Sequence, residues 1–312
     1  MSWIVVAIAA YFLLAISNLV DKFLVEKVLG SARAYTFVAC VLGAAIFVAA
    51  PWVLEWPGWV GLFYNLILGG IFATALLLLF ASLRRGEASR ALVIIGGSTP
   101  VFTLPLAYFI LGDRMPSGEL LAIIFLIAGV AVVAMLPGRK PSFWTKIVGQ
   151  VTERPSTKTS IALALASGLA YSLFFVGSKY VYQDQSFLSA FLWMRLGAAI
   201  FASLLLTSAQ ARYEIKALFA RKPGRKRNQS LVVGNQVVGA LGFVLQNYAV
   251  YLGPVALVNA LQGVQYAWII VLGAVVTAFK PQILKEDICW RALTQKGIAI
   301  LFIGVGLYLL AV

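Results

Sequence analysis

Polar side chains lie inside several long apolar segments of this sequence, where they could bind a small molecule. In the segment 255–278, Asn259, Gln262 and Tyr266 recur at intervals of three and four residues, which places them on one face of a helix. Gln265 lies beside them, near the middle of the segment. An unpaired amide in hydrocarbon costs several kcal/mol. These side chains therefore pair across helices, which would be purely structural, or they meet water and a ligand. For the group as a whole we expect a binding surface.

Other apolar segments carry amides and hydroxyls that could line the same site. Gln236 and Asn247 share a helix face, Tyr171 lies on the polar face of another segment, and Asn18 lies in the first segment. Pairing with a neighbouring helix is again the structural alternative for each amide. The predicted substrate-binding residues are Asn18, Ser98, Thr99, Tyr171, Arg195, Gln236, Asn247, Asn259, Gln262, Gln265 and Tyr266.

Arg195 is the only charged residue well inside an apolar segment. It lies about nine residues from the outer end of its segment, which is ~13 Å along a helix. A charge at this depth is a functional candidate, because a ligand carboxylate or phosphate could pair with it. The alternative is that the long side chain extends to the membrane interface. The sequence leaves both interpretations open.

The segment 91–111 has no charge and is long enough to cross a bilayer, but its middle is poorly suited to a helix. Its helix-breaking residues are Gly96, Gly97, Pro100 and Pro105. Irregular backbone at bilayer depth is tolerated only where it is buried in protein or lines a wet cavity. We therefore predict a helix break that faces an internal pathway. The alternative is a proline kink in which hydroxyls such as those of Ser98 and Thr99 bond to their own backbone.

The composition is that of an integral membrane protein. Apolar residues make up 62% of the 312 residues, charged residues make up 12%, and the mean hydropathy is +0.93. There is no histidine, and the two cysteines have no metal-binding spacing. No nucleophile–base pair or phosphate loop is found either. We predict no enzymatic activity, no metal and no cofactor.

Hydropathy predicts an all-α fold of ten transmembrane helices. The ten spans are 3–20, 34–54, 58–82, 89–111, 119–136, 160–181, 187–208, 230–252, 255–278 and 295–312. Of the 25 Lys and Arg residues, 22 lie in the loops after odd-numbered spans, whereas the opposite loops hold only Arg114 and Lys179. This asymmetry predicts that both termini lie outside and that the basic loops are cytoplasmic. The net charge of +14 then reflects attraction to anionic lipid and not to nucleic acid.

A duplicated hexapeptide divides the chain into two halves. The residues LGAAIF occur at 42–47 and again at 196–201, each in the second span of a five-span set. We therefore predict a first repeat over 1–137, a cytoplasmic linker with a short interfacial helix over 138–159, and a second repeat over 160–312. Because each repeat crosses the membrane an odd number of times, the two halves insert with opposite orientations. Many secondary transporters share this arrangement, with the substrate site at mid-membrane between the repeats.

Two stretches of the sequence resemble a known family. The first is the pattern Gly86, Pro100, Leu111-Gly-Asp113, Gly118 and Gly129, and the second is NYAVYLGPVALVNALQGVQYAW at 247–268. Both are similar to the EamA-type transporters of the drug/metabolite transporter superfamily. The resemblance implies two inverted five-helix repeats around a central cavity, secondary transport, and export as its direction.

We therefore expect an alternating-access exporter of small metabolites, such as amino acids, in the cytoplasmic membrane. A flippase for lipids or lipid-linked sugars is the second hypothesis, and a membrane scaffold or receptor is the third. No acidic residue lies well inside a span, so we do not expect proton coupling through a central carboxylate. Coupling through acids at helix ends, such as Asp21, stays open. The sequence predicts nothing about the oligomeric state.

Overall fold

A computed structural model describes most of the chain. The described residues are 2–27, 31–85, 88–114, 116–134, 158–219 and 225–279, with short stretches between 294 and 309. Within these residues all regular structure is helical and no strand occurs. The predicted all-α class is therefore confirmed for this part of the chain. The predicted interfacial helix in the linker lies outside the described residues, as does most of the last predicted span.

The helices begin and end close to the predicted spans. In the first half they are α1 (Ser2–Lys27), α2 (Ala32–Gly43) with η1 (Ala44–Ala49) and α3 (Ala50–Val53), α4 (Gly58–Arg85), α5 (Ala88–Leu106) with η2 (Ala107–Leu111), and α6 (Ser117–Ala134). In the second half they are α8 (Lys158–Val181), α9 (Phe187–Ser203) with η3 (Leu204–Thr207), α10 (Ala209–Phe219), α11 (Arg225–Leu252), α12 (Val255–Ala260) and α13 (Gln262–Phe279). Helix α10 was not predicted.

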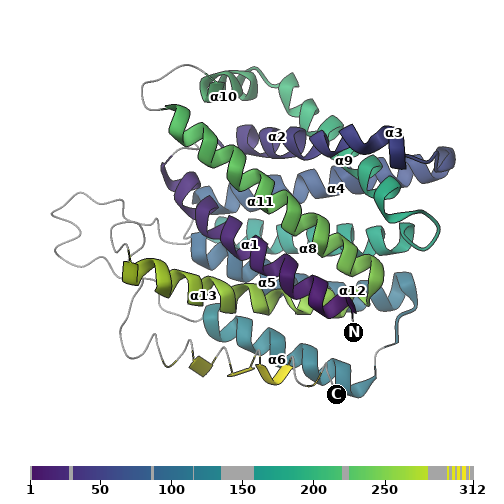
Figure 1. Ribbon diagram of the computed structural model, residues 1–312, viewed down its shortest axis with the longest axis vertical. Helices are drawn as coiled ribbons and strands as arrows, with labels where there is room; N and C mark the ends of the chain where they lie inside the picture. The colour runs from purple at the N-terminus through teal and green to yellow at the C-terminus, as the bar shows by residue number, and fades with distance from the viewer. Residues whose placement is uncertain are drawn as a thin grey trace.

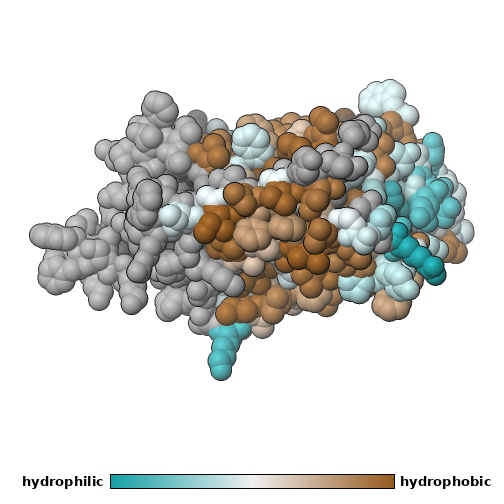
Figure 2. Space-filling view, turned by 90° about the horizontal axis from the view of Figure 1, so that it is seen from below, coloured by the Kyte–Doolittle hydropathy of each residue, from teal (hydrophilic) through white to brown (hydrophobic). Residues whose placement is uncertain are grey.

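Six of the described helical segments are long and apolar enough to cross a membrane. They are Trp3–Asp21, Ala32–Val53, Gly58–Arg85, Ile94–Leu111, Lys158–Val181 and Phe187–Thr207. Figure 2 shows an apolar region across the middle of the molecule, with hydrophilic residues gathered at one end of it. Large side chains such as Val48 (76% exposed) and Phe109 (80% exposed) point outward, as expected for a surface in contact with lipid. The protein is therefore a multi-pass membrane protein.

Four helix pairs make up much of the packing of the bundle. Helix α1 lies along α11, and α4 lies along α8, while α4 also packs on α9 and α5 packs on α8 (Figure 1). Each of these pairs joins a helix of the first half to a helix of the second half. The two halves are thus interleaved, and the largest group of buried apolar side chains contains residues from both.

Helices α4 and α9 cross with their backbones in contact. A Cβ atom on Gly69 would lie 2.2 Å from the Met194 carbonyl oxygen, and one on Gly197 would lie 2.6 Å from the Leu66 carbonyl oxygen. Small residues allow this approach, which is common between membrane helices because packing provides the attraction there. Gly197 belongs to the second LGAAIF copy. In the first copy α2 ends at Gly43 and becomes a 3-10 helix, so the repeated residues differ in local structure.

The break predicted in the fourth span is not found at Gly96, Gly97 and Pro100, because α5 runs through all three without interruption. Pro105 lies one residue before the end of α5, and the irregular backbone follows it, as the π turn of η2. The hydroxyls in the middle of the helix bond back to its own carbonyls: Ser98 and Thr99 to Ile95, and Thr103 to Thr99. The alternative interpretation of this segment therefore agrees with the structure.

Candidate functional site

Arg195 lies inside the bundle, between aromatic rings from three helices. Its guanidinium carbon is 4.2 Å from the ring centroid of Phe243 in α11, 4.4 Å from that of Phe72 in α4 and 4.8 Å from that of Phe191 in α9. The side chain is only 9% exposed, and it lies about two turns (~12 Å) from the start of α9. It therefore does not extend to the interface. We call these four residues the arginine cluster.

The positive charge of the arginine cluster has no acidic partner among the described residues. Each cation–π contact is worth about 2 kcal/mol when desolvated, whereas burying an unpaired ion costs several kcal/mol. The helix facing the guanidinium offers little bulk, because a Cβ on Gly43 would lie 3.4 Å from Nη1 of Arg195. Since a guanidinium recognises a carboxylate through two parallel N–H bonds, this arrangement suits a bound anion.

Tyr171 adjoins the arginine cluster. Its ring centroid is 6.2 Å from that of Phe72, and also 6.2 Å from that of Phe175. The sequence predicted Arg195 and Tyr171 for one site, and the structure brings them into one group of rings. The three phenylalanines were missed, because a Phe in an apolar span has no sequence feature that separates it from a lipid-facing residue.

Two predicted amides have partners within the protein. Asn247 donates from Nδ2 to the Phe243 carbonyl (2.9 Å) and its Oδ1 accepts from the Tyr182 hydroxyl (3.4 Å). Gln236 donates from Nε2 to the Tyr35 hydroxyl (2.8 Å), about two turns (~10 Å) along α11 from Phe243 of the arginine cluster. For these two residues the structural alternative agrees with the contacts. Asn18 is half-buried, with no hydrogen bond to another described residue.

A second group of polar atoms lies where α12 ends and α13 begins. Asn259 is fully buried and donates from Nδ2 to Thr103 Oγ1 (3.0 Å), but its Oδ1 has no partner among the described residues. The indole nitrogen of Trp268 is also buried, and no described residue forms a hydrogen bond with it. Gln265 is 3% exposed and makes no hydrogen bond within the described part of the chain. Gln262 is half-buried. The side chain of Tyr266 lies outside the described residues.

The unpaired atoms near α12 and α13 are costly to leave unsatisfied, at roughly 1–3 kcal/mol each. Water or a polar ligand would remove that cost. Thr103 belongs to α5, so this group joins the two spans that carry Ser98, Thr99 and Asn259. Ser98 is half-buried and lies against α8, because a Cβ on Gly168 would meet its Oγ at 2.1 Å.

Thermal stability distinguishes buried polar groups that stabilise the fold from those that are available to bind a ligand. Gln265→Leu should keep or raise the thermal stability, because no hydrogen bond among the described residues is lost. Thr103→Val should lower the free energy of unfolding by about 1–3 kcal/mol, because the buried Nδ2 of Asn259 loses its acceptor. Thermal unfolding of the two purified variants in detergent would measure the difference. Equal destabilisation by both would show that Gln265 is a packing residue.

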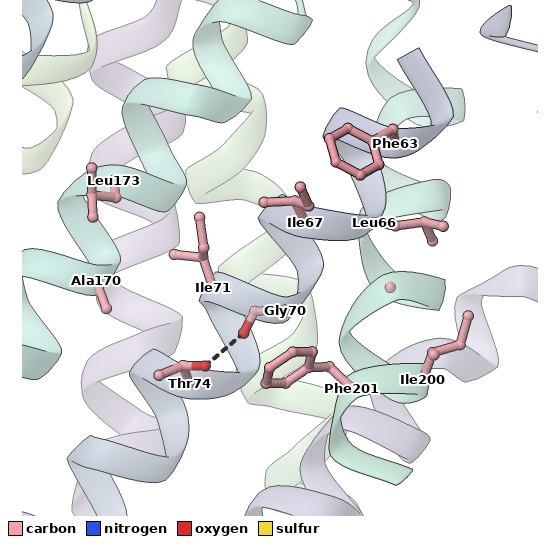
Figure 3. Close-up of a pocket in the computed structure, with 11 residues that line it drawn as sticks. Phe63, Leu66, Ile67, Gly70, Ile71, Thr74, Ala170, Leu173, Ile200 and Phe201 are labelled. Atoms are coloured by element: carbon pink, nitrogen blue, oxygen red, sulfur yellow. Dashed lines mark hydrogen bonds between the residues drawn. The ribbon is translucent and has the colours of Figure 1, made fainter. Parts of the chain in front are cut away.

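A groove on the surface of the bundle has a volume of about 510 Å³ and lies between α4, α8 and α9 (Figure 3). It is lined by Phe63, Leu66, Ile67, Gly70, Ile71, Thr74, Ala170, Leu173, Gly197, Ile200 and Phe201. The one hydroxyl in it is satisfied, because Thr74 donates to the Gly70 carbonyl at 2.9 Å. The groove contains none of the predicted site residues. Its chemistry suits a hydrocarbon chain and not a polar metabolite.

No group of three or more His, Cys, Asp or Glu side chains that could hold a metal ion occurs in the described residues.

Comparisons with known proteins place the fold. A solved crystal structure of another protein matches with a TM-score of 0.65 and 16% identity, over 99% of this chain and 96% of that one. At this identity the likeness shows the fold alone. No curated protein matches the chain. The resemblance found in the sequence is confirmed by a family match, because residues 1–135 match the EamA-like transporter family.

Proposed function

We propose that the protein is a secondary transporter that moves a small organic anion across the membrane, with Arg195 as its binding group. Membership of residues 1–135 in a family of transporters, which are not enzymes, supports the general activity. The observation that carries the proposal is the buried guanidinium of Arg195 at mid-depth, which has no acidic partner among the described residues. An intramembrane charge without a protein partner is expected to meet a ligand.

The positive charge of the arginine cluster restricts the chemical class of the substrate. A zwitterion such as an amino acid would bring an ammonium group near Arg195, and that ammonium would need an acidic or carbonyl partner. The contacts of the guanidinium among the described residues are three aromatic rings, and none is acidic. A metabolite with net negative charge, such as a monocarboxylate, neutralises the site without a second charge. We therefore favour an organic monoanion over the amino acids that the sequence first suggested.

We further infer that the helices form two inverted repeats and that the transporter works by alternating access. Under this symmetry α1 corresponds to α8 and α4 corresponds to α11, so the α1–α11 and α4–α8 pairs should be equivalent. Both pairs are long and closely packed, in support of the symmetry. The pairs α4–α9 and α11–α2 should also be equivalent, yet the first has touching backbones and the second makes few contacts. Such a difference is expected when the repeats adopt one of two alternating states.

A transport assay tests the proposal directly. Proteoliposomes containing the purified protein should exchange a radiolabelled monocarboxylate, such as lactate or benzoate, faster than neutral leucine. In parallel, the metabolites released by cells that make the protein should be compared with those released by cells that make Arg195→Met. The proposal predicts that the difference consists of anions. Equal export by both cell lines, with no anion exchanged in proteoliposomes, would refute it.

The proposed topology makes a separate prediction. In a Cys289→Ser background, Arg85→Cys should react with a membrane-impermeant maleimide only from the cytoplasm, because Arg85 is exposed at the basic end of α4. Asp184→Cys, which is exposed in the loop between α8 and α9, should react only from outside. Intact cells and inside-out vesicles distinguish the two. Labelling of the Arg85 position in intact cells would show that the basic end of α4 lies outside, opposite to the proposed topology.

A flippase is the second candidate, and the apolar groove between α4, α8 and α9 favours it. A lipid could hold its acyl chain in the groove while an anionic headgroup reached the interior of the bundle. The same proteoliposomes, loaded with a fluorescent anionic lipid, would then show movement of the lipid between leaflets. Transport of lactate or benzoate without lipid movement would favour the metabolite transporter.

A further inference from the structure

We propose that Asp21 is a proton-binding site and that its protonation releases a latch between the two halves of the transporter. The inference rests on the proposed transport function and on the proposed cytoplasmic position of the basic helix ends. Oδ1 of Asp21 in α1 accepts a hydrogen bond from the Tyr35 hydroxyl in α2 (2.6 Å) and another from Nδ2 of Asn235 in α11 (2.7 Å). The Tyr35 hydroxyl in turn accepts from Gln236 in α11 (2.8 Å). We call these four residues the latch.

The latch joins helices of both halves at one end of the bundle. Helices α1 and α2 belong to the first half and α11 to the second, and the residues in contact are 214 and 201 positions apart. Away from the latch, α2 and α11 make few contacts. Any movement that separates α11 from α1 and α2 at this end must break the latch. It therefore lies where a gate between the basic-end solution and the arginine cluster would be.

The two hydrogen bonds that Asp21 accepts in the latch favour its ionised form. An ionised carboxylate only accepts, and both neighbours donate to it. Such charge-assisted bonds are roughly twice as strong as neutral ones. Oδ2 of Asp21 has no partner among the described residues, so a proton can add there without displacing either donor. Protonation then removes the charge that strengthens both bonds.

No Lys or Arg side chain that the structure describes forms an ion pair with Asp21. None would therefore have to move away when a proton binds. Tyr35 is the titratable group that faces it from α2, while Arg33 of the same helix is exposed. Helix α11 presents the neutral amides of Asn235 and Gln236, and α13 has no charged residue between Gln262 and Phe279. Both Tyr35 (2% exposed) and Asn235 (6% exposed) are buried. A proton is therefore the ligand that can change the charge of the latch.

Ser17 offers a position from which opening can be measured without a substrate. It is 5% exposed, lies one turn from Asp21 towards the middle of α1, and its Oγ is 3.5 Å from the Asn235 carbonyl oxygen. In a Cys289→Ser background, Ser17→Cys is labelled with an impermeant maleimide in inside-out vesicles. The same chain without Ser17→Cys corrects for Cys40, which is buried.

The readout is the labelling rate of Ser17→Cys divided by the rate of the same chain carrying Asp21→Asn, at each pH. This ratio removes the pH dependence that the thiol has in common in the two chains. We expect Asp21→Asn to be labelled about tenfold faster than the parent near pH 8, because two charge-assisted bonds are lost. As the pH is lowered, the two rates should converge to within about twofold, because the parent becomes protonated as well. Asp21→Glu should keep the pH dependence.

Each outcome decides the proposal. A ratio that is the same at every pH would show that Asp21 does not titrate in the gate, and a ratio of one throughout would show that the latch does not restrict access. A labelling rate that depends on the sodium concentration at fixed pH would show that Asp21 binds a metal cation. That result would contradict the proposed proton-binding site. If Asp21→Asn does not fold, Tyr35→Phe keeps the acid and loses one donor. It should be labelled faster near pH 8 and remain pH-dependent. The labelling test uses no substrate. It can therefore be interpreted even if the transport assay shows no activity.

Discussion

Replacing Arg195 with methionine is expected to make the protein more stable and to abolish exchange of its substrate. A buried ion without an ionic partner costs several kcal/mol, and replacement by an apolar side chain of similar volume is often stabilising. The three cation–π contacts offset part of that cost, at about 2 kcal/mol each for desolvated pairs. Methionine keeps the aliphatic packing among Phe72, Phe191 and Phe243. We expect the free energy of unfolding to rise by about 1–3 kcal/mol.

The loss of transport should be large in the same variant. Removing one partner of a buried charge pair typically costs 3–5 kcal/mol, which corresponds to a fall in affinity of at least about 100-fold. Counterflow of a radiolabelled monocarboxylate in proteoliposomes would measure this fall, and thermal unfolding followed by tryptophan fluorescence would measure the stability. Such a combination of higher stability and lost activity is typical of a functional residue that is held in an unfavourable environment.

Arg195→Lys is the matched control for the charge. Lysine keeps the positive charge but loses the planar group that stacks on rings and binds a carboxylate through two bonds. We expect partial transport, with a weaker apparent affinity and an unchanged preference for anions. If Arg195→Met were less stable than the parent and still exchanged the substrate at the normal rate, the arginine would be a packing residue.

The fold was largely predictable because hydropathy and charge carry the signal for membrane helices. Each span needs about 20 apolar residues regardless of its partners, so the described helices begin and end near their predicted positions. Local backbone was less predictable. The identical residues LGAAIF form a 3-10 helix from Ala44 in one copy and a regular α-helix in the other. The sequence alone cannot distinguish them, because the tertiary contacts of the two copies differ.

Residues of the candidate site could be recognised in the sequence only where a residue type is unusual for its position. Arg195 was identified because a charge within a span is rare, whereas Phe72 and Phe243, its ring partners, look like any lipid-facing residue. For the amides, the sequence left two interpretations open. Gln236 and Asn247 were predicted to bind substrate, yet each has a protein partner. Whether a buried amide finds a partner within the protein depends on which helices pack together. Those helix contacts could not be predicted from the single sequence.

Gly69→Ala is expected to be the most damaging small substitution in the described part of the chain. The added Cβ would lie 2.2 Å from the Met194 carbonyl oxygen and 2.5 Å from the Ala198 nitrogen. Both contacts are backbone atoms of α9, so no side-chain rotation can relieve them. Overpacking usually costs 1–3 kcal/mol. We expect about 3 kcal/mol or more here, because two helices must separate to admit the methyl group.

Separating α4 from α9 should also disrupt the arginine cluster. Phe72 lies one turn after Gly69 on α4, and Arg195 lies two residues before Gly197 on α9. Any shift at this crossing therefore moves the ring away from the guanidinium, and Gly69→Ala should lose anion exchange together with stability. Arg195→Met, in contrast, should lose exchange alone.

Gly118→Ala and Gly234→Ala are the matched controls, because a Cβ at either position meets nothing within 4 Å. Both should fold and exchange the substrate like the parent, as expected for alanine replacing glycine within a helix. Size-exclusion profiles and thermal unfolding in detergent would compare the three variants. A monodisperse Gly69→Ala protein with the parent's melting temperature would mean that α4 and α9 do not touch in the membrane. The position of Phe72 over Arg195, which depends on that crossing, would then be wrong as well.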